Sequence, residues 1–346
     1  MRIQMSISVA LLVVGIGTAL WGQGASGGIL GTIRDQSGGV VPGANVVITN
    51  QGTGRARNIA TDVRGSYRAP GLEAGTYDVQ ATLSGFRSVV KRGVELNVGS
   101  EVVVDIAMEV GEVTESISVE AEVPLVQTTS AQLSGLVGHE QIRDLPLNAR
   151  SFEQLALLEP GLVQHTNFTP SVGVRTTNGG GTKMSIAGLP TNFNSYLLDG
   201  TAMRDHSGFG LGSVATVNLG IDSILEFQVL TQNYSAQYGL TAGGIINSVT
   251  RSGTNTLHGG AFEFLRNNVF DARQFFDVGG TQPFRRNQFG AFIGGPIVRN
   301  RTFFFGNYEG LRERLATTGI STVPDANARQ GIVPGRTIAV SPVIRP

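Results

Sequence analysis

A chain of 346 residues is long enough for two or three domains, and its 26 basic and 26 acidic residues balance, which argues against nucleic acid as a partner. The complete lack of cysteine excludes disulfides, cysteine-ligated zinc and iron–sulfur clusters. With 48 glycines and only 15% charged residues, the composition predicts a mainly β protein rather than a helical bundle.

The N-terminus has the features of a secretion signal. Arg2 gives a short basic region, and the apolar run Ile7–Leu20 has the length of a signal core and is short for a membrane span. Small residues follow between Gly22 and Ser26. We therefore expect a signal peptide over 1–25, with an uncleaved anchor as the alternative. Because the chain has no second run of this length that is as consistently apolar, any membrane insertion would use β-structure.

Residues 26–109 predict a small β-sandwich. Short strands alternate with turn signals at intervals of about 8–12 residues. The alternation is clearest at Tyr77, Val79, Ala81 and Leu83. More specific features are Gly31-Thr32-Ile33, Pro42-Gly43-Ala44, Thr61-Asp62 with Gly65 and Tyr67, and Ser84-Gly85-Phe86. On these residues the segment resembles the carboxypeptidase regulatory-like domain, a transthyretin-like sandwich of the carbohydrate-binding-like fold.

The resemblance is to an accessory domain and not to a peptidase. None of the four histidines stands in a His-x-x-Glu pair, so the sequence offers no zinc-peptidase site. The sandwich either binds a glycan or a protein on an exposed face, or it is a spacer. Tyr67, Tyr77 and Phe86 are expected in its core, because no aromatic cluster marks a sugar platform.

Residues 110–127 form an acidic, Ser/Thr-rich and β-branched stretch that Pro124 closes. This composition predicts either a plain linker or an extended edge strand. A short extended peptide can add as a strand to the sheet of a partner.

Residues 128–253 predict a small mixed domain. Short helices are expected over 138–143 and from Asn148 or Ser151 to Pro160-Gly161, and strands follow in 183–188, 194–200 and 226–230. Four short motifs appear in order: Ser185-Ile186-Ala187-Gly188; Tyr196-Leu197-Leu198-Asp199-Gly200; Ile224-Leu225-Glu226-Phe227-Gln228-Val229; and Tyr238-Gly239 with Ala242-Gly243-Gly244-Ile245-Ile246-Asn247. In this order they resemble the plug domain of TonB-dependent outer-membrane transporters.

The preceding sandwich is similar to the N-terminal extension of the Oar-like (SusC-like) receptors of that family. In those receptors the segment between extension and plug carries the TonB box, with which the inner-membrane protein TonB pairs and on which it pulls. By position, the resemblance implies that the box is Thr114, Glu115, Ser116, Ile117, Ser118 and Val119, which departs from a strict consensus.

The resemblance also implies functional positions within the plug: Asp199, Gly200, Tyr238, Gly239, Gly243, Gly244 and Asn247. Asp199 is either a ligand contact or the first residue of an Asp-Gly turn, and the turn is the favoured interpretation. Gly243 and Gly244 lack a Cβ, so another backbone can approach them closely or φ can be positive. Asp205-His206 offers no third metal ligand at a suitable spacing.

Residues 254–346 predict long strands with alternating faces. Phe262 and Phe264 share one face and Glu263 the other, and the strands 284–298 and 301–315 follow. This pattern is typical of outer-membrane barrels, and the segment 294–310 resembles the first barrel strands of the Oar-like receptors. Three or four strands cannot close a barrel, because plugged transporters have about 22. We therefore expect the N-terminal portion of a longer receptor, in which 254–346 begin an incomplete barrel.

These observations predict a mainly β chain with a sandwich, an α+β plug and the first strands of an outer-membrane barrel. The expected function is a TonB-dependent receptor, with TonB and the outer membrane as partners and the sandwich on the periplasmic side. The sequence does not distinguish between a glycan, a peptide and a siderophore as the ligand. The alternative is a secreted or surface-attached adhesion protein of serial β-domains. An enzyme is not expected, and neither is a cofactor, since no catalytic or metal constellation is recognisable.

Overall fold

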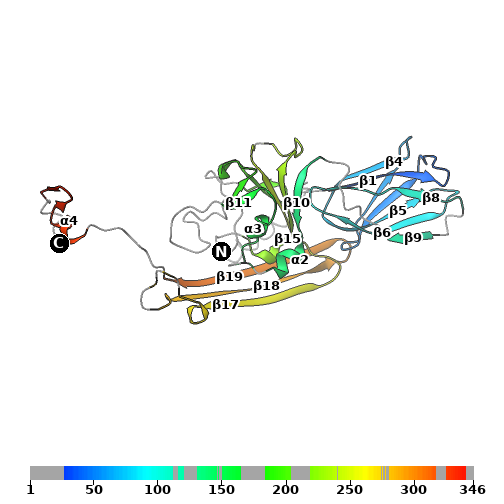
Figure 1. The fold of residues 1–346 in the computed structure, drawn as a ribbon. Helices are drawn as coiled ribbons and strands as arrows, with labels where there is room; N and C mark the ends of the chain where they lie inside the picture. Colours follow the sequence, from blue (N-terminus) through cyan, green and yellow to red (C-terminus); the bar gives the residue numbers. More distant parts are fainter. Residues whose placement is uncertain are drawn as a thin grey trace, which may run out of the picture. The chain divides into compact units, whose positions relative to one another are not determined.

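The computed structural model (Figure 1) describes residues 27–111, 116–120, 131–145, 147, 150–164, 184–203, 219–239, 241–273, 275, 277, 280–316 and 325–339. The expected signal peptide and Asp205-His206 lie outside these residues. The chain divides into two compact units: one consists of 1–167, 174–264 and 287–312, and the other of 168–173, 265–286 and 313–346.

The first domain of the larger unit is a sandwich of two sheets. One sheet has the order β4(Ser66–Leu72)-β1(Gly27–Asp35)-β7(Glu101–Val103), with β8(Ile106–Met108) also paired to β1. The other has the order β3(Ala56–Ala60)-β2(Asn45–Asn50)-β5(Gly75–Thr82)-β6(Ser88–Leu96)-β9(Ser116–Glu120). Alternate residues of β1, β2, β4, β5 and β8 fill one core between the sheets, as the period of two requires, and β6 adds Val89, Val94 and Leu96.

The expected core aromatics lie in this sandwich. Tyr67 and Tyr77 are buried, and Phe86 is partly buried against the same core. The Tyr67 hydroxyl donates to the Val104 carbonyl at 2.6 Å, which satisfies its one polar group. Burial raises the pKa of the Tyr77 hydroxyl, an effect larger than the opposing hydrogen bond to Asn50.

The second domain is an α+β plug built on one mixed sheet. Its order is β10(Leu133–Val137)-β15(Ile224–Gln232)-β16(Ile245–Thr250)-β13(Ser195–Leu198)-β14(Thr201–Ala202). The pairs are antiparallel except β13 with β16, which is parallel. Its remaining elements are α2(His139–Asp144), α3(Glu153–Ala156), β11(Leu162–Gln164), β12(Met184–Ile186), η2(Thr191–Phe193) and η4(Ile221–Ser223).

The helix expected between Ser151 and Pro160 is shorter than the sequence predicts. Only four residues of α3 are α-helical. The next backbone bonds span three residues, from Leu157 N–H to the Gln154 carbonyl and from Leu158 N–H to the Leu155 carbonyl. The last turns are therefore tight turns of 3₁₀ type, which are common where a helix ends. Phe152 and Leu155 still reach the plug core together with Phe227.

The third sheet consists of three long strands in the order β17(His258–Asn267)-β18(Phe284–Val298)-β19(Thr302–Leu315). The short helix η5(Asn268–Phe270) follows β17. The last described elements are α4(Ala326–Arg329), β20(Ile332–Val333) and β21(Arg336–Thr337), of which β20 and β21 pair with each other. Among the described helices, none has the length and apolar character needed to span a membrane.

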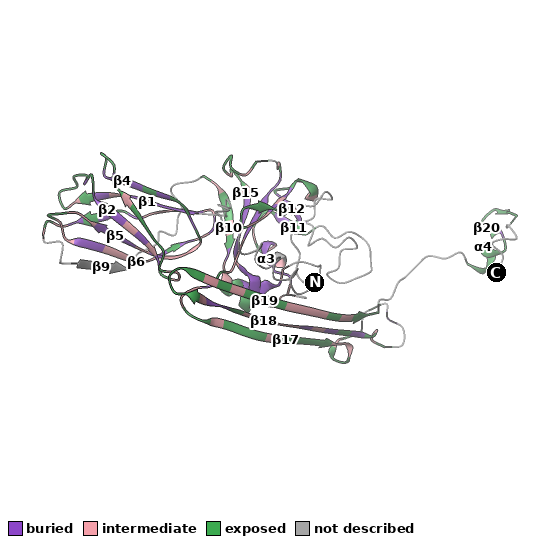
Figure 2. Ribbon diagram, turned by 180° about the vertical axis from the view of Figure 1, so that it is seen from behind, coloured by how far each residue is buried: buried purple, intermediate pink, exposed green. Residues whose placement is uncertain are grey.

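On β18 and β19, several polar side chains are buried and several apolar ones are exposed, whereas soluble proteins bury their apolar side chains. Buried, intermediate and exposed residues are interspersed along β18 (Figure 2). The polar residues Arg286 and Gln288 of this strand are buried, whereas Ile293 and Ile297 are exposed. On β19 the Glu309 side chain is 1% exposed. A polar inner face and an apolar outer face are what a barrel strand needs in lipid.

Candidate functional site

The glycine pair Gly243-Gly244 directly precedes β16, the central strand of the plug sheet, at a point with no room for side chains. A Cβ on Gly243 would lie 2.7 Å from the Phe193 carbonyl oxygen, and one on Gly244 would overlap Ile186. The close approach permits two backbone hydrogen bonds, from Gly243 N–H to the Phe193 carbonyl and from Ser195 N–H to the Gly244 carbonyl, at 3.0 and 2.9 Å. The pair thus joins β16 to β13.

Asp199 and Gly200 form the turn between β13 and β14. Their φ angles are +49° and +79°, the left-handed pair that a two-residue hairpin turn requires. The Asp199 carboxylate also accepts hydrogen bonds from the backbone N–H and the hydroxyl of Thr250, at 2.9 and 2.8 Å. The side chain therefore ties the hairpin to the end of β16.

The other predicted plug residues lie along β16 and the loop that precedes it. Asn247 is buried in β16, in register with Leu197 on β13 and Gln228 on β15. Tyr238 is half-buried, and burial raises the pKa of its hydroxyl more than hydrogen bonds with Gln237 and Asn247 lower it. Gly239 is exposed, with open space where a Cβ would lie. The structure therefore gathers these residues around β16 in different environments.

A buried ion pair between the plug loop and the β19 strand was not foreseen from the sequence. Arg150, at φ +53°, places its guanidinium 2.6 Å from the Asp222 carboxylate and 3.5 Å from that of Glu309. The three side chains are 14%, 12% and 1% exposed. The guanidinium also lies over the Phe262 ring, 3.8 Å from its centroid. All three charged side chains are therefore largely removed from solvent where the plug meets β19.

Further polar contacts surround the cluster Arg150–Asp222–Glu309. The Gln288 amide donates to the Glu309 carboxylate at 2.5 Å, and the Asn307 amide donates to the Ser223 hydroxyl at 2.6 Å. Arg251, directly after β16, lies over the Phe292 ring at 4.7 Å from its centroid. The plug thus contacts the polar inner face of the strands, which is how a domain inside a barrel lumen is expected to be held.

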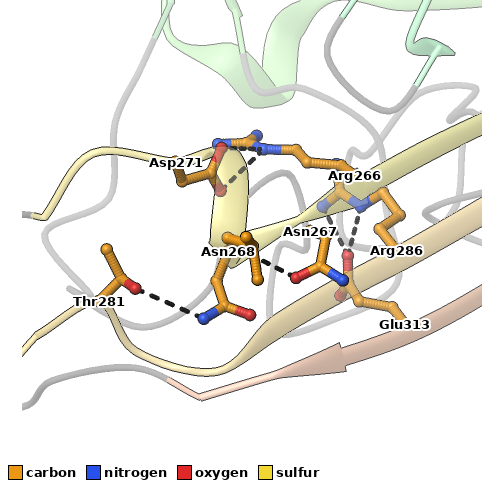
Figure 3. Close-up of polar contacts among 8 residues, drawn as sticks. Arg266, Asn267, Asn268, Asp271, Thr281, Arg286 and Glu313 are labelled. Carbon is orange, nitrogen blue, oxygen red and sulfur yellow. Dashed lines mark hydrogen bonds and ion pairs between the residues drawn. The ribbon is translucent and has the colours of Figure 1, made fainter.

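In the smaller unit, hydrogen bonds order the end of β17 and the sides of β18 and β19 (Figure 3). Asn267 caps η5 by accepting from Val269 N–H at 3.1 Å. Arg266 pairs with Asp271 at 3.2 Å, and Arg286 donates to the Glu313 carboxylate at 2.6 Å. The Arg286 and Glu313 side chains are 10% and 7% exposed, so the polar inner face continues to this end of the strands.

The segment predicted to carry the TonB box contains β9. Its backbone runs parallel to β6, in register from Ser88 with Ser116 to Arg92 with Glu120. Ser116, Ile117, Ser118 and Val119 belong to β9, whereas Thr114 and Glu115 lie outside the described residues. The predicted edge strand is thus present, and its partner is the sandwich of the same chain.

One turn of the sandwich touches the plug. Val98 N–H donates to the Glu226 carboxylate of β15 at 2.5 Å. Gly99, at φ +66°, has no space for a Cβ beside the Gln228 amide oxygen, 2.6 Å away. Glu226 is buried, and this burial raises the pKa of its carboxyl more than the bond from Val98 lowers it. This turn directly follows β6, the strand that holds β9.

Three domain families match the sequence in the order in which the structure places its parts. A carboxypeptidase regulatory-like domain matches residues 28–109 and a TonB-dependent receptor plug domain matches 126–245. An outer membrane β-barrel domain matches 249–344. Together these matches support a TonB-dependent receptor. The matched domains are a sandwich, a plug and outer-membrane barrel strands, in the order that the sequence predicts.

A curated relative supports the same family. The TonB-dependent transporter Oar of Myxococcus xanthus is 28% identical over 309 residues, which cover 84% of this receptor chain and 27% of Oar. The chain therefore spans about a quarter of the length of the curated relative it matches. The family is one of receptors and transporters.

Solved structures resemble parts of the chain. The siderophore receptor PirA from Acinetobacter baumannii has a TM-score of 0.37 and 21% identity, covering 51% of this chain and 24% of that one. Hydroxyquinol 1,2-dioxygenase from Pseudomonas putida DLL-E4 has a TM-score of 0.22 and 10% identity, covering 25% and 57%. Likeness of this degree carries no argument about function.

Proposed function

We propose that this receptor binds an extracellular ligand and imports it across the outer membrane with energy from TonB. The observation that carries the proposal is the buried contact of Arg150 with Asp222 and Glu309, because it seats the plug against the polar face of barrel strands. A plug held in this way blocks the lumen, and import requires that it move. The receptor has no enzymatic step in this scheme.

The coupling partner is TonB, and the contact is the box Thr114–Val119. Its described part, Ser116 to Val119, is already extended, the conformation that strand addition requires. In this scheme the sandwich and the linker face the periplasm, where TonB can reach them. A glycan, a peptide and a siderophore all remain suitable as ligands.

Within the plug, the proposed roles follow the local geometry. Gly243 and Gly244 allow β16 to join β13, and Asp199 with Gly200 ties the hairpin to Thr250. Asn247, Tyr238 and Gly239 belong to the same strand and its preceding loop, where a pull would first disturb the central sheet. These residues serve plug integrity and release rather than ligand recognition.

Site-specific photocrosslinking in cells tests the proposal. A photoreactive residue at Ile117 is expected to give an adduct with TonB, because the position lies in the box. The matched control is Val63, an 86% exposed position on the same sandwich, which should give none. Absence of the Ile117 adduct in outer membranes that contain the receptor, or equal adducts from both positions, would contradict the coupling role.

A further inference from the structure

The receptor's own sandwich holds most of the proposed TonB box as a strand. β9 lies at the end of the five-stranded sheet, beyond β6, and includes four of the six box residues. Five consecutive register pairs join it to β6, from Ser88–Ser116 to Arg92–Glu120. The described part of the box, Ser116 to Val119, is thus part of a folded sheet rather than a free linker.

The chain is also fixed to the sandwich just before β9. Arg87 N–H donates to the Glu109 carbonyl at 2.8 Å, and Gly111 N–H donates to the Gly85 carbonyl at 3.1 Å. Between these bonds Phe86 and Val110 form an antiparallel bridge, and the Arg87 and Glu109 side chains pair at 3.1 Å. The chain is therefore held, as far as Gly111, to the same loop from which β6 begins.

We propose that the sandwich presents the box to TonB, so that a TonB strand adds to the outer edge of β9 while its inner edge stays paired with β6. This inference rests on the proposed coupling function. In a β-strand successive backbone groups point to opposite edges, so pairing with β6 leaves alternate N–H and C=O groups of β9 directed outward. Such an edge is a ready template for another strand.

Holding the box on the sandwich lowers the entropic cost of binding TonB. An extended peptide that is free in solution loses backbone entropy when it adds to a sheet. A box already held straight on β6 has lost that entropy during folding, so TonB binds it more tightly. The turn after β6 contacts Glu226 of the plug through Val98. A pull on β9 would therefore reach β15 through the sandwich as well as through the linker.

A disulfide lock between β6 and β9 tests the inference. The chain contains no cysteine, so Val90→Cys with Ser118→Cys, two register partners, introduces one possible bridge. Register partners in neighbouring strands have Cα atoms within the range of about 4.4–6.8 Å that a disulfide needs. The control, Val90→Cys with Ser116→Cys, is displaced by two residues and should oxidise poorly. The assay is binding of the purified periplasmic part of TonB to the detergent-solubilised receptor.

The expected result is that the 90–118 bridge forms and that the oxidised receptor binds TonB within about threefold of its reduced form. If oxidation abolishes binding and reduction restores it, β9 must leave β6 and presentation is wrong. If the 90–118 pair oxidises no better than the control pair, β9 is not held on β6 and the inference also fails. If the unsubstituted receptor does not bind TonB at all, the proposed coupling function fails instead.

Discussion

Replacement of Arg150 by Met tests whether the buried ion pair holds the plug in place. The change removes the positive charge that faces Asp222 and Glu309, while the Met side chain retains part of the packing on Phe262. Breaking one partner of a buried pair costs about 3–5 kcal/mol, because the remaining charges stay buried and uncompensated. At about 1.4 kcal/mol per factor of ten, opening of the plug should become at least a hundredfold more frequent.

A single cysteine in the plug can report this opening. Ser248 in β16 is 0% exposed and its hydroxyl has no hydrogen-bond partner in the described structure, so Ser248→Cys is a mild change. A thiol reagent should label it only when the sheet opens, and the labelling rate should follow the opening equilibrium. The rate is compared between the Ser248→Cys receptor with Arg150 and the same receptor with Arg150→Met.

The matched control is Arg143→Met. Arg143 also pairs with an aspartate, Asp144, but these side chains are 56% and 61% exposed. Solvent screens an exposed pair of this kind, so labelling should change by less than about tenfold. Equal labelling rates in the Arg150 and Arg143 variants would refute the view that the buried contact retains the plug.

Three further predictions concern the plug sheet. Gly244→Ala should destabilise the plug by about 1–3 kcal/mol in urea unfolding, because Ile186 occupies the space of the new methyl group. The control Gly239→Ala should be nearly neutral, because the space around that position is open. Asp199→Ala should lower the free energy of unfolding by about 1–2 kcal/mol in the same assay, because it removes both hydrogen bonds to Thr250. Asp199→Asn should lower it less, because asparagine tolerates the left-handed turn. Burial raises the Glu226 pKa above its ordinary value of 4.5, so its stabilising contribution is full below that pH and is lost as pH rises through the raised value. The gain in Tm from Glu226→Gln should therefore grow between pH 4 and pH 7, and a constant gain would contradict the burial effect.

Local patterns in the sequence predicted much of the fold. The limits of β18 match the predicted strand 284–298, because its alternation and the turns on both sides are local signals. The Asp199-Gly200 turn was likewise predicted, since the dipeptide itself favours left-handed φ angles. Both features depend on neighbouring residues only, which is why a single sequence suffices for them.

The polar contacts between residues far apart in the sequence could not be predicted in this way. Arg150 and Asp222 are 72 residues apart, and neither stands in a recognisable motif. The pairing of β9 with β6 was missed for a related reason, because an extended acidic segment suits a linker and an edge strand equally well. A non-glycine residue at positive φ, such as Arg150, is a structural signal of special backbone demands that composition does not reveal.

The position of β16 in the plug sheet has a consequence for biosynthesis. It is the last strand of the plug in the sequence, yet it lies between β15 and β13 and pairs with both. A chain that emerges N-terminus first completes the two sheets of its sandwich core long before this strand appears. At about 5–20 residues per second, the roughly 50 residues between β13 and the end of β16 take several seconds to emerge. β13 lacks its β16 partner throughout that interval, and β15 lacks it from the time β15 itself appears, so the centre of the plug sheet is completed only by the last strand.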